Sequence, residues 1–210
     1  MATVTHALTT LAKVKQYLGI TSSTNDALIE SLINYVTDYI ESLCGGRRFK
    51  EATYTNEVYD NPDGNNLFLR QYPIQSVSVV EYRTGTISSP TYVAFSADDF
   101  IVYKPEGYIH FFAMFGGITE GEQALRTTYV AGYKIDFSNE LTPASHSLPF
   151  DVAWLATELC TMLFNRRASQ GLKAESTEGQ SVTYGSLSEQ DLSPAQKEVI
   201  VKYQKHRLTI

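Results

Sequence analysis

The chain has 210 residues, enough for one large domain or two small ones with a proper core. Its 17 basic and 23 acidic residues give a formal net charge of −6, which argues against a broad nucleic-acid-binding surface. The hydrophobic fraction of 43%, with 14 tyrosines and 10 phenylalanines, is typical of a folded protein rich in strands and argues against extensive disorder.

The N-terminal residues and the cysteines indicate a reducing, aqueous compartment. Residues 1–10 lack a basic region followed by an apolar run, and no stretch approaches the roughly 18 apolar residues of a membrane span. Cys44 and Cys160 lie far apart and without metal-binding spacing, so both are predicted to be buried, reduced thiols. We therefore expect a protein that is cytosolic when made and has no membrane partner.

Two helices are predicted near the N-terminus. The first spans Leu11–Leu18, with Thr9 or Thr10 as its cap and Gly19 at its end. The second runs from Leu28 to Leu43 and ends at two consecutive glycines. Its apolar residues follow helical spacing at Leu28, Ile29, Leu32, Ile33, Val36, Ile40 and Leu43.

From Thr53 onward the hydrophobic period changes to two, which is typical of strands. Within Ser76–Tyr82 the residues alternate strictly between two faces, and both faces carry apolar side chains. This pattern favours a small barrel or sandwich, most simply an antiparallel meander. The predicted strands are Thr53–Tyr59, Leu67–Arg70, Ser76–Arg83, Phe100–Tyr103, Tyr108–Phe112 and Leu125–Tyr133.

The helical pattern returns after Pro149. A helix over Val152–Leu163 is expected to pack on the second helix. A polar, mobile arm is predicted to follow, with a strand-like island at Ser181–Tyr184. A last helix is predicted to begin at Ser193, which forms a capping box with Gln196.

These elements predict the α+β fold class. The predicted architecture is a small helical bundle scaffold with an inserted antiparallel β-module and a C-terminal strand-plus-helix arm. The predicted boundaries are 1–50 and 137–168 for the scaffold, 51–136 for the β-module and 169–210 for the arm.

Sequence motifs for chemistry are missing. The sequence contains no GxSxG, HExxH, Walker A or GxGxxG motif, and its four histidines have no second ligand-type residue at metal spacing. The segment Asp60–Asn66 is a turn sequence with the wrong register for a calcium loop. Asp98 and Asp99 would point to opposite faces of a strand. We therefore expect neither an enzyme nor a bound cofactor or metal.

Two arginine pairs mark the ends of predicted helices. One interpretation is compensation of the helix dipole by solvated side chains. The other is a set of inter-subunit bridges to acidic residues of the arm. The residues concerned are Arg47, Arg48, Arg166 and Arg167, with Glu175 and Glu178 as the acidic partners.

Four collinear segments resemble one known family, the head-tail connector (adaptor) proteins of long-tailed bacteriophages and gene transfer agents. The resemblance covers well over half of the chain in the family's order, although each segment alone is degenerate. The segments are LAKVKQYLGI (Leu11–Ile20) with DALIESLINYVTDYIESLCGGRRF (Asp26–Phe49), LRQYPIQSVSVVEYR (Leu69–Arg83), TYVAGY (Thr128–Tyr133) with LPFDVAWLATELCTMLFNRR (Leu148–Arg167), and SVTYGSLS (Ser181–Ser188).

The resemblance implies a structural virion protein at the neck. It would form a ring of about twelve copies beneath the portal protein, extend the DNA channel and present a surface to tail or stopper proteins. DNA would pass without sequence-specific binding, and the inserted β-module, absent from compact members, would face outward. The C-terminal segment would dock on the portal through Val182, Tyr184, Val199, Ile200 and Tyr203.

Two alternatives remain open at this stage. The aromatic-rich strands could instead form a carbohydrate- or cell-surface-binding module, which would show coplanar exposed aromatic rings. A small hydrolase with a split active site would need Asp98 or Asp99 to converge with His110 and a nucleophile.

Overall fold

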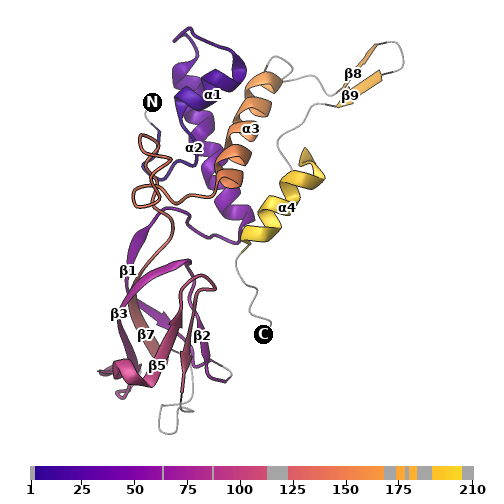
Figure 1. Ribbon diagram of the computed structural model, residues 1–210. Coiled ribbons are helices and arrows are strands. Elements are labelled where there is room, and N and C mark those ends of the chain that lie inside the picture. Colours follow the sequence, from indigo (N-terminus) through magenta and orange to yellow (C-terminus); the bar gives the residue numbers. More distant parts are fainter. Residues whose placement is uncertain are drawn as a thin grey trace. The chain divides into compact units, whose positions relative to one another are not determined.

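The computed structural model describes residues 3–62, 64–86, 88–112, 123–167, 174–177, 180–183 and 191–204, with backbone alone for 174–177 and 180–183. The chain divides into two compact units, which are described separately (Figure 1). The helical unit comprises residues 1–49 and 135–210, and the β-unit comprises residues 50–134. Helices and antiparallel sheets together confirm the α+β class. A separate arm from residue 169 stays a prediction.

The helical unit is built on α3, which contacts the other three helices. α1 and α2 pack on α3, as expected for the second helix, and α4 packs on it as well. The predicted ends are confirmed where Thr10 accepts a hydrogen bond from the Lys13 amide and Gly19 adopts a φ of 67°. No described helix is both long and apolar enough to cross a membrane. The helices are α1 Leu11–Leu18, α2 Asp26–Leu43, α3 Phe150–Arg166 and α4 Pro194–Tyr203.

The segment before α1 is part of the helical core. Leu8 is fully buried, and its amide donates to Thr37 Oγ1 on α2 over 3.3 Å. The hydroxyl of Thr9 lies 2.7 Å from that of Thr157 on α3. Because these hydroxyls are buried and paired, they attach the N-terminal segment to both α2 and α3.

The β-unit contains two antiparallel sheets with strand orders β1-β7-β3-β4 and β2-β6-β5. Their side chains share one hydrophobic core, to which Leu67 and Phe111 of the small sheet and Val80 and Tyr129 of the large sheet belong. This arrangement is a sandwich. The strands are β1 Ala52–Tyr59, β2 Asn66–Phe68, β3 Ile74–Arg83, β4 Tyr92–Ala94, β5 Phe100–Tyr103, β6 Tyr108–Phe111 and β7 Leu125–Ala131.

The expected meander is wrong, because β7 lies between β1 and β3, and β6 lies between β2 and β5. β7 has a buried residue at every second position, from Leu125 to Ala131, and a strand with such a face gains most from a central place in its sheet. Chain order alone does not specify that place.

The strict alternation expected for β3 is also wrong. The strand carries irregularities between Ile74 and Ser76 and between Val77 and Val79. Each extra residue of a bulge shifts the alternation of faces by one position. Val77 and Val80 therefore both contact the core, although their spacing of three would separate them in a regular strand.

The strand-like island is confirmed over residues 181–183, which form part of β9 (Gln180–Thr183) and pair with β8 (Ala174–Thr177). One further expectation needs correction. Asp98 and Asp99 lie in a 3-10 turn, Ala97–Asp99, and not in a strand. Ser96 and Asp99 form the capping box that favours this turn over an extended backbone.

Candidate assembly surfaces

α2 carries two apolar lines, one buried and one partly exposed. Ile29, Ile33, Val36 and Ile40 form the buried line. A second line at the same helical spacing, which we call the α2 outer stripe, consists of Leu28, Leu32, Tyr35 and Tyr39. Leu28 and Tyr35 are 41% and 50% exposed, and the rings of Tyr35 and Tyr39 stack with centroids 6.1 Å apart. The spacing of these four residues, four, three and four apart, is the signal in the sequence that identifies the stripe.

A second exposed apolar surface, the α3 aromatic patch, consists of Tyr17, Phe150 and Trp154. Phe150 and Trp154 are 63% and 54% exposed and lie one turn apart on α3. The ring of Tyr17 on α1 meets that of Trp154 edge to face at 5.3 Å. Trp154 Nε1 donates to Glu158 Oε1 over 2.8 Å, so the indole is held in an exposed position.

α4 is anchored by two of the predicted docking residues. Ile200 and Tyr203 are buried in the helical unit, whereas Val199 is half-buried and Val201 is exposed. Tyr203 donates from its hydroxyl to Asp151 Oδ1 over 2.9 Å. The predicted stripe of α4 therefore faces its own chain.

Asp151 connects α3 with α4 through charge as well. Lys202 Nζ lies 2.7 Å from Asp151 Oδ2. Burial alone would raise the pKa of Asp151, but the hydrogen bonds from Lys202 and Tyr203 outweigh burial and lower this pKa. The same bond to Asp151 raises the pKa of Lys202. The pair holds α4 in a charge-assisted contact.

The first arginine pair is used within the chain. Arg47 is 1% exposed, its Nη1 donates to the Tyr203 carbonyl over 3.2 Å, and its guanidinium lies 5.1 Å from the Phe49 ring centroid. Arg48 is accessible and pairs with Asp38 and Glu41. Arg48 is therefore the member of this pair that a neighbouring subunit can reach.

The second pair also has partners within the helical unit. Arg166 Nη2 lies 3.4 Å from Asp191 Oδ1, and the Arg167 guanidinium lies 3.5 Å from the Phe164 ring centroid. Of the predicted acidic partners, Glu178 lies outside the described residues and Glu175 is described by its backbone only. The inter-subunit bridges stay a prediction.

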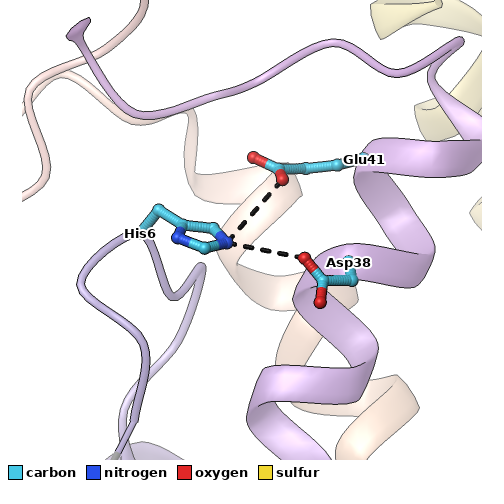
Figure 2. A group of neighbouring side chains, drawn as sticks. All are labelled: His6, Asp38 and Glu41. Carbon is cyan, nitrogen blue, oxygen red and sulfur yellow. Dashed lines mark ion pairs between the residues drawn. The ribbon is translucent and has the colours of Figure 1, made fainter.

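A group of three possible metal ligands, His6, Asp38 and Glu41, forms where the N-terminal segment meets α2 (Figure 2). Sequence spacing gave no sign of it, because His6 lies far from α2 along the chain. His6 Nε2 lies 3.5 Å from Asp38 Oδ1 and 3.9 Å from Glu41 Oε2. Nitrogen and carboxylate ligands of this kind suit zinc.

Arg48 already supplies the positive charge at this group. Its Nη1 lies 3.2 Å from His6 Nε2 and 3.4 Å from Asp38 Oδ1, and it bonds Glu41 directly. A metal ion would have to displace this guanidinium, so the donor set does not fit a resident metal. The group is an ion-pair network that attaches the N-terminal segment to α2.

The remaining candidates for chemistry do not converge. Asp99 accepts from the Ser96 amide, and His110 Nδ1 lies 2.6 Å from Asn66 Oδ1, so each of the two is bonded to a different residue and not to the other in these bonds. Cys44 and Cys160 are buried and unbonded as predicted, and burial raises their pKa values to about 11 and about 12. Thiols of this kind are unreactive.

The outer face of the small sheet carries the aromatic residues that a sugar-binding module would use. Phe68, Tyr108 and Tyr103 lie opposite one another across β2, β6 and β5. Tyr103 and Tyr108 stack at 4.5 Å with 10° between their planes. Tyr103 is 40% exposed whereas Phe68 and Tyr108 are half-buried, so one ring of this row is open to solvent.

Partly exposed apolar faces on the described helices are typical of a protein of the assembly class. Comparison with protein families identifies the family to which it belongs. The sequence matches the head completion protein family over residues 7–206, and the chain belongs to this family. It is accordingly a structural protein of head completion.

Solved structures share the fold. A chain in the neck of an empty gene transfer agent (GTA) particle computed with C6 symmetry is 13% identical at a TM-score of 0.56, covering 94% of this chain and 90% of that chain. A chain in the virion of a native GTA particle is 14% identical, with a TM-score of 0.56 and the same coverage. A third, in the neck of a native GTA particle computed with C12 symmetry, is 13% identical at a TM-score of 0.55, covering 94% and 89%. No curated protein matches the sequence.

Proposed function

We propose that this chain is a head-tail adaptor that forms a closed ring of about twelve copies beneath the portal protein. The ring extends the DNA channel and offers its far side to a tail or stopper protein. The chain belongs to the head completion family, and it shares its fold with chains in GTA necks computed with C6 and C12 symmetry. The protein reaches this location in the virion after synthesis in the host cytoplasm.

The observation that carries the proposal is the pair of exposed apolar surfaces on different helices of one unit. A cyclic ring needs a heterologous contact, in which one surface of each copy meets a different surface of the next. The α2 outer stripe and the α3 aromatic patch supply two such surfaces, and both contain the aromatic side chains that are enriched in interface cores. We assign the contact between neighbouring copies to them.

Docking on the portal belongs to the C-terminal segment in this proposal. Because Ile200 and Tyr203 hold α4 on its own unit, the outward residue Val201, which is 65% exposed, and the half-buried Val199 are available to a partner. Val182 and the undescribed Tyr184 belong to the same segment.

The charge distribution supports a channel that conducts DNA without gripping it. The net charge is −6, and the described arginines near the helix ends are engaged with carboxylates, carbonyls or aromatic rings of their own chain. A surface without a continuous array of available cations has little affinity for the phosphate backbone.

Assembly on purified portal tests the proposal. Wild-type protein mixed with portal is expected to form a second ring that is visible by electron microscopy. Tyr35→Glu and Trp154→Glu each place a charge in one of the two surfaces and are expected to reduce ring yield at least about tenfold. Val93→Glu, which changes an exposed apolar residue of β4, serves as the matched control. Normal rings from both helical variants would contradict the assigned contact, and failure of the wild type to form a ring on portal would contradict the function.

A further inference from the structure

The small sheet of the β-unit ends in an open strand. In the described part of the chain, β5 pairs with β6 along one edge and with no strand along the other, although just beyond its end the Lys104 carbonyl accepts from the Ile74 amide over 2.8 Å. An unpaired edge presents backbone donors and acceptors to any strand that can approach it. β5 is short, but two of its four side chains, Ile101 and Tyr103, are exposed, at 46% and 40%.

The hydrogen-bond pattern shows which backbone groups face that edge. The Phe112 amide donates to the Asp99 carbonyl over 3.0 Å, which makes residues 99 and 112 a bonded pair. Bonded and non-bonded pairs alternate along an antiparallel ladder, so Ile101 and Tyr103 direct their backbone groups toward β6. Phe100 and Val102 therefore direct theirs toward the open edge.

The β5 edges of two antiparallel copies are complementary to each other. When a second β5 approaches antiparallel with Ile101 opposite Ile101 of the copy, Phe100 of each chain lies opposite Val102 of the other. These are the residues whose backbone groups face outward, so each such pair can exchange two hydrogen bonds. Asp98 lies in the 3-10 turn just before β5 and Lys104 in the turn just after it, and both are exposed, so this approach brings the Asp98 end of each strand next to the Lys104 end of the other. A parallel approach in register would bring like charges together.

We propose that two copies of this chain associate through β5, forming one continuous six-stranded sheet across a two-fold axis. The opposite charges at the two ends of β5 favour the antiparallel direction, and the apolar Ile101 side chains meet at the axis. Pairing also covers an edge that would otherwise recruit unrelated strands. The contact joins two chains only, and it lies on the β-unit, so it is independent of the heterologous contacts that the proposed ring requires.

A disulfide at the axis gives the most direct test. Opposed residues of a non-bonded antiparallel pair have close Cβ atoms, so Ile101→Cys is expected to form a covalent dimer under mild oxidation. Phe112→Cys is the control, because Phe112 is at least as exposed but lies one strand away from the axis. The native cysteines are buried and do not compete. Equal disulfide yields from both variants, or none from Ile101→Cys, would overturn the proposal.

Charge exchange tests the direction of pairing. Sedimentation equilibrium of the wild type is expected to show a weak, concentration-dependent dimer. Lys104→Glu and Asp98→Lys are each expected to weaken it about tenfold, and the double variant to restore it, because the opposite charges are then exchanged and not lost. A double variant as weak as the single ones would contradict the assigned register. A dimer that is insensitive to these changes but abolished by Tyr35→Glu would assign association to the helices and overturn the β5 contact.

Discussion

At the scale of single residues, Glu41 organises the turn that follows α2. Its side chain is 4% exposed, Oε1 accepts from the Phe49 amide over 3.0 Å, and Oε2 bonds Arg48. The charge of Glu41 is the largest cause of the raised pKa of Arg48. One buried carboxylate thus fixes both the backbone after the turn and the side chain that completes the His6 network.

We expect Glu41→Gln to destabilise the helical unit by about 1–3 kcal/mol, because the amide keeps the shape of the side chain but leaves Arg48 without its buried counter-charge. Trp154 is the single tryptophan of the chain and lies on α3, so its fluorescence during urea unfolding reports on this unit. Asp38→Asn is the control, since Asp38 is 65% exposed and its loss should cost at most about 0.5 kcal/mol. Equal losses from both variants would mean that burial of Glu41 is unimportant.

At the scale of elements, α4 depends on tertiary contacts more than on its own sequence. The predicted capping box of Ser193 and Gln196 with Pro194 is confirmed and fixes where the helix starts. A ten-residue helix is nevertheless marginal alone in water. The bonds from Tyr203 and Lys202 to Asp151 therefore decide whether α4 stays in place on α3.

These bonds predict that the stability contributed by the Asp151–Lys202 pair is lost at both low and high pH. Because the folded pKa of Asp151 is depressed, its contribution is present above the ordinary value of 3.8 and is lost as pH falls through the folded pKa. Because the folded pKa of Lys202 is raised, its contribution is present below the ordinary value of 10.5 and is lost as pH rises through the folded pKa. Between these limits stability from the pair should be flat.

The difference in melting temperature between wild type and Asp151→Asn, followed by Trp154 fluorescence, measures this contribution. It should be constant near neutral pH and shrink at both extremes. Glu30→Gln, at an acidic residue of α2, corrects for the general effect of losing a carboxylate. A difference that does not change with pH would show that the Asp151 charge has no part in holding α4.

The sequence predicted those features of the elements that depend on residues close together in the chain, and it did not predict those that depend on distant residues. The caps at Thr10, Gly19 and Ser193 are local, so neighbouring residues specify them. Strand order and the bulges of β3 depend on residues distant in the chain. The spacing of apolar residues also does not show what covers them: Ile200 and Tyr203 face their own unit, whereas Leu28 and Tyr35 of the α2 outer stripe are exposed.

At the scale of the whole molecule, the β-unit has the geometry of an insertion that can be removed. It is one continuous segment, residues 50–134, between the two parts of the helical unit. Its ends meet: Lys50 and Tyr133 form a β-bridge, and the Glu51 amide donates to the Tyr133 carbonyl over 2.8 Å. Gly132 permits this approach, since its φ is 112° and a Cβ there would lie 2.7 Å from the Lys50 carbonyl oxygen.

Because the ends are adjacent and the core of the sandwich is drawn from its own strands, we expect residues 50–134 to fold when expressed alone. The helical unit should likewise fold when a short Gly-Ser linker replaces this segment, since a short loop closes the same gap at little entropic cost. Circular dichroism and amide chemical shifts of each piece would be compared with those of the full chain.

Gly132→Val in the isolated β-unit is the control and should weaken the contact between the two ends of this unit. If the linker variant is folded and still forms rings on portal, ring assembly belongs to the helical unit, whereas two unfolded pieces would show that the units stabilise each other.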